Sequence, residues 1–288
     1  MPRGLDHIVH AVHDLDAAAD LCRNAGFTVG ARNRHPPAWG TENHIVQLPG
    51  FFVELLAVAE PAGIAPHGPR SLSFGAFNRD FLVDDQGLSM LVLASNNAAD
   101  DATAFRTAGI SDFDVFDFSR EARRPNGEVV KVAFSLAFAQ DTAAPKAGFF
   151  TCQQHYPENF WNPAFQNHAN TVEHVAGVVM VANEPLRHRD FLLAYTGVDS
   201  ARGDGDGFHI GLPRGAIDVM TPAVFTHRFG LPAPKVVLGP RLAALRFSVG
   251  EISTVKTRLE QCGIAATAHP GALAAAFMGA VLVFERPR

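Results

Sequence analysis

The chain has 288 residues, of which 47% are hydrophobic and 18% are charged. This composition supplies enough apolar surface for a sizeable core and excludes a disordered chain. The net charge is -5 and no long basic run is present, which argues against nucleic acid as a partner.

The cysteines and the chain ends bear on cellular location. The cysteines are an odd number without close pairs, which excludes a disulfide framework and a cysteine zinc site: Cys22, Cys152 and Cys262. Asp6 and His7 stand where a signal peptide needs a continuous apolar stretch. The uncharged stretch 263–284 contains the turn sequence His269-Pro-Gly, which favours two strands over a membrane span. The sequence predicts a cytoplasmic protein without membrane association.

The first predicted unit covers residues 4–27 and begins with an apolar strand. Asp14 then caps a short amphipathic helix, which stops at Gly26. Three strand-like runs follow: 27–31, 44–48 and 51–58. A proline-rich insert near 61–86 leads into a short helix predicted around 74–81.

The same order of elements recurs three more times along the chain. The second copy aligns with the first without a gap, and its helix stops at Gly109. The three further copies begin at Gly87, His174 and Arg241. Each unit is therefore a strand, a helix and about three strands. Four such units fill the chain apart from the insert and a linker near 156–171.

Paired βαβββ units resemble the vicinal oxygen chelate superfamily of glyoxalases, bleomycin-resistance proteins and extradiol dioxygenases. More closely, the first 58 residues are similar to the glyoxalase-like domain, in the segments Leu5-Asp-His-Ile-Val, Asp14-Leu-Asp-Ala-Ala, Arg34-His-Pro, Trp39-Gly-Thr-Glu-Asn43 and Phe52-Val-Glu-Leu-Leu56. The resemblance implies an α+β fold of four βαβββ modules paired into two half-open mixed β-barrels. We expect a glyoxalase-like domain over 1–156, a linker over 157–171, and a second, degenerate glyoxalase-like domain over 172–288.

The resemblance places metal ligands on the first and last strands of the first unit, at His7 and Glu54. An imidazole and a carboxylate also suit Zn, Fe, Mn or Ni. A buried carboxylate on the apolar strand 51–58 needs a partner, and a divalent metal ion supplies one. The alternative is that Glu54 faces solvent or pairs with an arginine, while His7 is a hydrogen-bonded core histidine.

The other units depart from this pattern at the position of His7. Met90 occupies that place in the second unit, and a thioether is a poor ligand for hard or borderline divalent metals. Ala244 occupies it in the fourth unit, and Ala176 or His174 in the third. We therefore expect the second pair of units to act as scaffold.

The counterpart of Glu54 in the second unit is Cys152 by simple alignment, or Gln154 or His155 with a small shift. His155 would complete a metal site of two histidines and one carboxylate, with His7 and Glu54. The alternative is that His155 is an exposed residue at the start of a turn.

Two segments are candidates for substrate contact. In the loop 34–44, Trp39 can stack on an apolar ligand, while His35 and Asn43 can donate to an oxyanion. A surface turn is the alternative. Gln153 and Gln154 end the last strand before the aromatic linker, which we expect to pack between the halves and also to wall the pocket.

The leading hypothesis is a divalent-metal-dependent lyase or isomerase that acts on a small oxygenated metabolite. Glu54 would be ligand and possibly base, with His7 as ligand. A non-catalytic sequestering protein of the bleomycin-resistance type is the main alternative, which Met90 supports, and an extradiol-type dioxygenase is another. We expect a small-molecule substrate and a monomer or homodimer.

Overall fold

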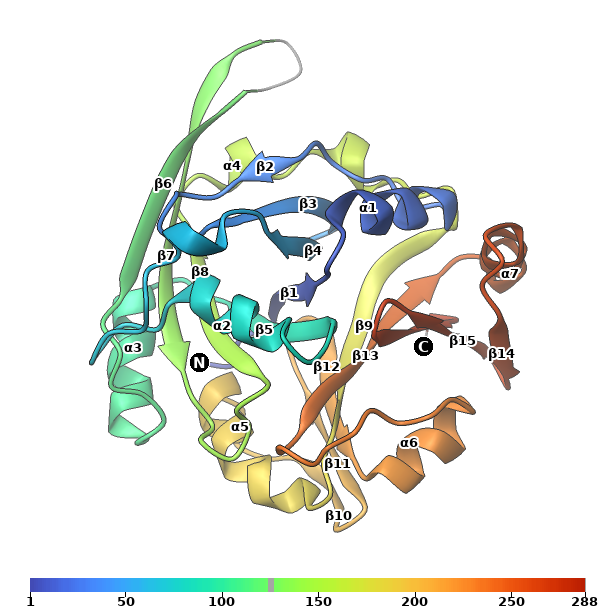
Figure 1. Ribbon diagram of the computed structural model, residues 1–288. Helices are drawn as coiled ribbons and strands as arrows, with labels where there is room; N and C mark the ends of the chain where they lie inside the picture. Colours follow the sequence, from blue (N-terminus) through green and yellow to red (C-terminus); the bar gives the residue numbers. More distant parts are fainter. Residues whose placement is uncertain (124–126, 288) are drawn as a thin grey trace.

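The computed structural model describes residues 1–123 and 127–287. The strands of this part of the chain form two eight-stranded mixed sheets, with strand orders β2-β3-β4-β1-β5-β8-β7-β6 and β10-β11-β12-β9-β13-β16-β15-β14. Figure 1 shows the first sheet curled around the blue-to-green half of the chain and the second in the yellow-to-red half.

The elements follow the order βαβββ four times. The first module comprises β1 (Leu5–Ala11), α1 (Leu15–Asn24), β2 (Asn33–Arg34), β3 (Thr41–Leu48) and β4 (Phe51–Val58). The insert holds η1 (Pro61–Gly63) and α2 (Phe74–Phe81). The second module comprises β5 (Gly87–Ala94), α3 (Ala98–Thr107), β6 (Phe116–Arg123), β7 (Val129–Ala139) and β8 (Gly148–Gln154).

The linker carries α4 (Pro157–Phe160) and η2 (Pro163–Gln166). The third module comprises β9 (Val172–Val181), η3 (Pro185–His188), α5 (Arg189–Thr196), β10 (Arg202–Asp204), β11 (Gly207–Gly211) and β12 (Ala216–Met220). After α6 (Pro222–Phe229), the fourth comprises β13 (Arg241–Val249), α7 (Ile252–Gln261), β14 (Ala266–His269), β15 (Ala272–Phe277) and β16 (Ala280–Glu285).

Each sheet is built around the first strands of its two modules. β1 pairs antiparallel with β5, and β9 with β13. The last strand of each module then lies parallel to the first strand of the same module: β4, β8, β12 and β16. The predicted fold of four βαβββ modules in two half-open mixed barrels is confirmed.

The segment 27–31 differs from the prediction, because it forms no strand and the ladder begins later, at β2. Its backbone bonds elsewhere: the Thr28 amide donates to His168 Nδ1 of the linker at 3.0 Å. The predicted helix of the insert is present as α2, with the Ser73 side chain accepting from the Ala76 amide.

Alternate side chains of the central strands enter different cores. Ile8 belongs to a large cluster that includes residues of both sheets, such as Leu91 and Leu245. Val9, its neighbour, belongs to a cluster confined to the first half-barrel. The two sheets therefore share one core on their convex sides, and each keeps a separate concave interior.

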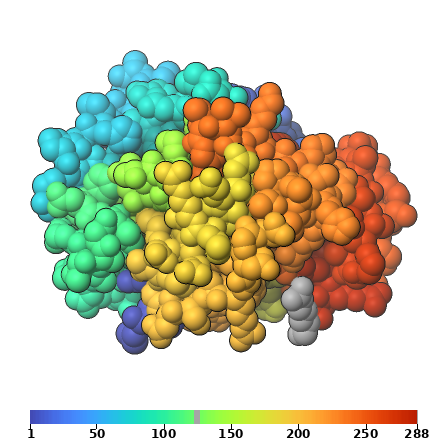
Figure 2. All heavy atoms as spheres, turned by 90° about the horizontal axis from the view of Figure 1, so that it is seen from below, coloured from blue at the N-terminus to red at the C-terminus, as the bar shows by residue number. Residues whose placement is uncertain are grey.

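The helices of the two halves meet across this shared core. Tyr195 on α5 packs its ring against Phe105 and Phe149 of the first half-barrel, at 5.8 Å and 5.3 Å between centroids. Figure 2 shows the yellow segment of the third module lying against the green second module on this face. In the described part of the chain, no helix is both long and apolar enough to cross a membrane.

Candidate functional site

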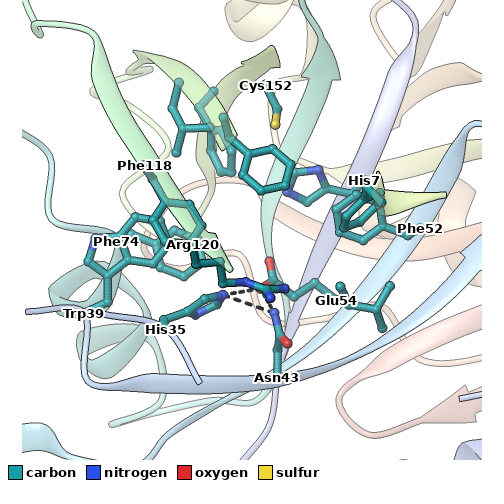
Figure 3. A pocket seen from close by; sticks show the side chains of 15 residues that line it. His7, His35, Trp39, Asn43, Phe52, Glu54, Phe74, Phe118, Arg120 and Cys152 are labelled. Atoms are coloured by element: carbon teal, nitrogen blue, oxygen red, sulfur yellow. Dashed lines mark hydrogen bonds and ion pairs between the residues drawn. The ribbon is translucent and has the colours of Figure 1, made fainter. Parts of the chain in front are cut away.

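The concave side of the first half-barrel holds a cavity of about 70 Å³. Nearly half of its lining residues are phenylalanine or tryptophan: Trp39, Phe52, Phe74, Phe118, Phe134, Phe150 and Phe160. A few polar side chains also line it, and Figure 3 shows His7, His35, Asn43, Glu54 and Arg120 around it. An apolar cavity with a few convergent polar groups is the usual form of a small-molecule site.

Glu54 lies on β4 and points into this cavity, with 5% of its surface exposed. Its Oε1 atom accepts a hydrogen bond from Asn43 Nδ2 at 2.6 Å. Asn43 is held in turn by Asn33, whose amide nitrogen donates to Asn43 Oδ1 at 3.3 Å. This second bond fixes which end of the Asn43 amide faces the carboxylate.

His35 is the third member of this cluster. Its Nε2 lies 3.1 Å from Asn43 Nδ2 and 3.4 Å from Glu54 Oε1. Because Asn43 Nδ2 is only a donor, His35 Nε2 must accept, and the ring proton then sits on Nδ1, which donates to Thr41 Oγ1 at 2.8 Å. Burial lowers the pKa of His35, although the nearby Glu54 raises it, which agrees with this neutral form.

His7 approaches the cavity from β1. Its ring stacks on Phe52 at 4.2 Å between centroids, and its Nδ1 lies 2.6 Å from Asp6 Oδ1. Gln154 Nε2 donates to the other oxygen of Asp6 at 3.0 Å. The chain Gln154–Asp6–His7 therefore fixes the ring and leaves its Nε2 atom on the cavity side.

Arg120 on β6 is a cavity residue that the sequence analysis missed. Phe116, Phe118 and Arg120 alternate along β6, so they share one face of the strand. Phe118 and Arg120 both line the cavity. This alternation was the available signal, but an arginine near the end of a polar strand is also typical of a solvated edge.

The predicted site residues divide into two groups. His7, His35, Trp39, Asn43 and Glu54 all line the one cavity. Trp39 is held there by a close approach of α2: a Cβ atom on Gly75 would lie 2.0 Å from the Trp39 carbonyl oxygen. Glycine alone permits this contact.

The second group lies outside the cavity wall. Gln154 supports Asp6 from behind, and Gln153 Oε1 accepts from the Ala98 amide at the start of α3, at 3.0 Å. His155 is exposed, and its Nε2 bonds to Ser135 Oγ at 2.7 Å. The structure does not bring His155 to His7 and Glu54.

The strand register identifies the counterpart of Glu54 in the second module. Glu54 lies opposite Val9 on β1, and Val92, the equivalent residue of β5, lies opposite Phe150. The counterpart is therefore Phe150, two residues before Cys152, because β8 is offset relative to β4. A phenylalanine ring offers no metal ligand.

The donor set of the cavity does not fit a metal centre with three protein ligands. His7 with its Asp6 support resembles a metal-binding histidine, and Glu54 lines the same cavity. However, burial raises the pKa of the Cys152 thiol well above its usual range, as do Asp6 and Glu54, so it stays protonated. Within residues 1–123 and 127–287, no group of three or more His, Cys, Asp or Glu side chains could hold a metal ion.

The second half-barrel carries a carboxylate at the place of Glu54. Asp218 on β12 lies opposite Val179, just as Glu54 lies opposite Val9, and both valines face the interior of their own half-barrel. Asp218 forms an ion pair with the buried Arg246 of β13.

Further groups complete this ion cluster. Arg246 also holds Glu285, with Nη2 to Oε1 at 2.5 Å and Nε to Oε2 at 3.2 Å. His209 Nδ1 lies 2.8 Å from Asp218 Oδ1. Burial lowers the pKa of Arg246, but Glu285 and Asp218 outweigh this effect and raise it, so Arg246 stays charged.

A half-open barrel of two βαβββ modules with a ligand cavity on its concave side defines the vicinal oxygen chelate class. The sequence matches the family described as "Glyoxalase-like domain" over residues 5–196, which is 192 of its 288 residues. The chain belongs to this family.

Solved structures show the same fold over the whole chain. A hypothetical protein from Staphylococcus aureus matches with a TM-score of 0.70 and 12% identity, covering 99% of this chain and 100% of that one. A mutant of 4-hydroxymandelate synthase from Streptomyces coelicolor matches with a TM-score of 0.59 and 11% identity, covering 100% and 94%.

A fusion protein of a xylose isomerase-like TIM barrel and 4-hydroxyphenylpyruvate dioxygenase matches with a TM-score of 0.53 and 11% identity. That match covers 100% of this chain and 50% of the fusion protein. A search of curated protein sequences finds no significant match. At these identities, the structural likeness establishes the fold alone.

Proposed function

We propose that the chain is a lyase or isomerase that moves a proton on a small oxygenated metabolite, with Glu54 as the base. One observation carries the proposal. Glu54 is a buried carboxylate in an aromatic cavity whose Oε1 is held by Asn43, while Oε2 has no hydrogen-bond partner among the described residues. An oriented carboxylate with one free oxygen can take a proton from a carbon next to a carbonyl group.

The neighbouring side chains support this chemistry. Asn43 and the neutral His35 orient the carboxylate without neutralising it by a cation. His7, steadied by Asp6, offers Nε2 as a second proton-transfer atom in the same cavity. Two such groups suffice for an isomerisation, in which one removes a proton from carbon and the other exchanges a proton at oxygen. The aromatic wall limits the contact of Glu54 with bulk water, since 5% of the residue's surface is exposed.

The test is proton exchange catalysed by Glu54. Wild-type protein is incubated in D₂O with a panel of small 2-oxo and 2-hydroxycarbonyl compounds, and loss of the C–H signal is followed by proton NMR. Glu54→Gln keeps the size of the side chain but removes its basicity, so the exchange rate should fall by about 10²–10⁴-fold. Glu60→Gln is the matched control, because Glu60 is an exposed carboxylate paired with Arg34. Equal exchange by wild type and Glu54→Gln would overturn the proposal.

A metal-dependent lyase or an extradiol-type dioxygenase would instead use His7 and Glu54 as ligands. This alternative is supported by the names of two structural neighbours, a synthase and a dioxygenase fusion protein. Elemental analysis of the purified protein separates the two cases. Near-stoichiometric Zn, Fe, Mn or Ni that is lost on His7→Ala would favour the metal-dependent reaction over the one proposed.

A sequestering protein without catalysis is the second candidate. The observation in its favour is that Met90 and Phe150 stand where the second module would supply reactive groups. Tight binding of a panel compound without any exchange or product would favour this function.

A further inference from the structure

A second cavity adjoins the first and is much larger. Its volume is about 570 Å³, and it shares three wall residues with the inner cavity: Ile45, Arg120 and Phe160. The inner cavity, at about 70 Å³, is smaller than the roughly 150 Å³ that takes up a benzene ring. Together they fall within the roughly 300–1,000 Å³ typical of small-molecule sites. A metabolite of ordinary size that reaches Glu54 must therefore occupy both, because Glu54 lines the inner cavity.

Arg120 lies at the boundary between the two cavities. It is half-buried, and burial lowers the pKa of its guanidinium group. Among the residues that the structure describes, its side chain forms one hydrogen bond, from Nη1 to the Glu121 carbonyl oxygen at 3.3 Å. In the described ranges 1–123 and 127–287, no carboxylate lies within 4.0 Å of it. A desolvated guanidinium without an acidic partner is suited to bind an anion, because the pair recovers the cost of burial.

The linker supplies the far wall of the outer cavity. Phe160, Trp161 and Phe165 line it with apolar surface. Gln47 on β3 fixes this wall, since its Nε2 donates to the Phe160 carbonyl oxygen at 2.9 Å and its Oε1 accepts from the Asn162 amide at 3.0 Å. The outer cavity thus has an aromatic wall from the linker and a cation at its boundary, and its other lining residues include the polar side chains Asn33, Gln47, Glu158, Asn159 and Asn162.

From this arrangement, and resting on the function proposed above, we propose that the substrate is an organic carboxylate that spans both cavities. Its small oxygenated end lies beside Glu54, and its carboxylate binds Arg120 at the boundary. Its apolar body lies in the outer cavity against Phe160 and Trp161. Arg120 is then the residue that selects acids over neutral molecules.

The two tryptophans of the chain make this arrangement measurable. Trp39 lines the inner cavity and Trp161 lines the outer one, and the chain has 2 tryptophans in total. The probe is 3-hydroxy-2-phenylpropanoate, which has a hydroxymethyl end, a carboxylate and a phenyl body on one carbon. The neutral control is its amide, which has nearly the same shape. Binding is titrated by tryptophan fluorescence in wild type and in the single variants Trp39→Phe and Trp161→Phe.

The acid should bind wild type at least about tenfold more tightly than the amide, which is a typical effect of one charge-assisted contact. Arg120→Gln should remove this preference, and Arg120→Lys should restore part of it. Arg106→Gln on α3 is the matched control, because Arg106 lies on the surface away from both cavities. Both single-tryptophan variants should still report binding. Equal affinity of wild type for acid and amide, or no response of Trp161, would overturn the proposal.

Filling the outer cavity provides a second measurement. Ala31 lies in its wall and is exposed, so Ala31→Phe should weaken acid binding several-fold without altering the inner cavity. Ala223→Phe on α6 is the control, at an exposed alanine of the second half-barrel. Unchanged binding by Ala31→Phe would contradict a body in the outer cavity.

The two proposals fail separately. If Glu54→Gln binds the acid like wild type but has lost proton exchange, and Arg120→Gln has lost the preference for acids, both stand. If Glu54→Gln still exchanges protons while Arg120→Gln loses the preference for acids, the base is elsewhere and the carboxylate site stands. If Arg120→Gln binds acid and amide like wild type while Glu54→Gln loses exchange, only the carboxylate site fails.

Discussion

The two half-barrels place a carboxylate at the same position but surround it with different partners, neutral side chains in the first and a cation in the second. Glu54 on β4 is held by the neutral side chains of Asn43 and His35 and faces an aromatic cavity. Asp218 on β12 is bound to the buried Arg246. The difference lies in the central strands, since β13 carries Arg246 whereas β1 and β5 carry no lysine or arginine. One fold therefore makes this position reactive or structural, according to whether a central strand supplies a cation that pairs with the carboxylate.

The largest expected effect is on the free energy of unfolding, and it contrasts Arg246 of the second half-barrel with Arg120 of the first. Arg246→Met removes the buried cation that pairs with both Asp218 and Glu285 and leaves Asp218 the longer 3.7 Å contact with Arg228, so the free energy of unfolding should fall by about 3–5 kcal/mol. Arg120→Met removes a cation that has no acidic partner among the described residues, so its effect should stay below about 1 kcal/mol. Urea denaturation of both variants measures the contrast. Similar losses would show that Arg246 is not a structural residue of the kind inferred.

The next effect concerns the contact between the half-barrels. His10 on β1 is fully buried with Nε2 at 2.8 Å from the Met278 carbonyl oxygen, and burial lowers its pKa to about 4 from 6.5. Below pH 6.5, His10 binds a proton in the unfolded chain but stays neutral in the folded chain until the pH approaches 4. The free energy of unfolding should therefore fall by about 2–3 kcal/mol between pH 6.5 and pH 4, with little further loss from this group below pH 4.

The matched variants are His10→Gln and His13→Gln. The first should lack this part of the acid sensitivity, whereas the second should keep it, because His13 is exposed. Urea denaturation at pH 7 and at pH 4.5 gives the difference. An equal loss of stability in His10→Gln and wild type would mean that acid acts at other groups.

The smallest expected effect on stability comes from replacing the carboxylate of each half-barrel by the corresponding amide. Asp218→Asn weakens the ion pair with Arg246, so the free energy of unfolding should fall by about 2 kcal/mol. Glu54→Gln keeps an oxygen for Asn43 and removes a buried charge, so stability should change by less than about 1 kcal/mol. Thermal unfolding by circular dichroism measures both. Greater damage from Glu54→Gln would reverse the contrast between the half-barrels.

Local patterns predicted the four modules, and the family resemblance added their pairing into two half-barrels and the places of His7 and Glu54. Helix caps and the recurrence of one strand, one helix and further strands gave the modules, including the α2 insert. Alternation along β1 puts His7 on the cavity side and His10 on the side of the shared core. Glu54 and the loop residues His35, Trp39 and Asn43 reached the cavity as expected, because each lies on or next to a strand of the first module.

The remaining parts depend on relations between distant strands. The offset of β8 that puts Phe150 opposite Val92 is set by pairing, so a simple alignment chose Cys152 instead. Arg120 comes from a strand at the far edge of the sheet, and its place at the cavity follows from the curvature of that sheet. The ion pairs of Arg246 could not be predicted from the sequence either, because its partners Asp218 and Glu285 lie on other strands.

The Tyr195 hydroxyl lies 2.7 Å from the carbonyl oxygens of both Leu91 and Phe150. Tyr195 belongs to the third module by sequence but packs against the first half-barrel. The first strand of the third module, β9, pairs with β13 in the second half-barrel. A chain cut within the linker would leave the first sheet without this helix, and a chain cut after Thr196 would leave β9 without its neighbours. The two halves are therefore not independently stable domains, and we expect them to unfold cooperatively, as one thermodynamic unit.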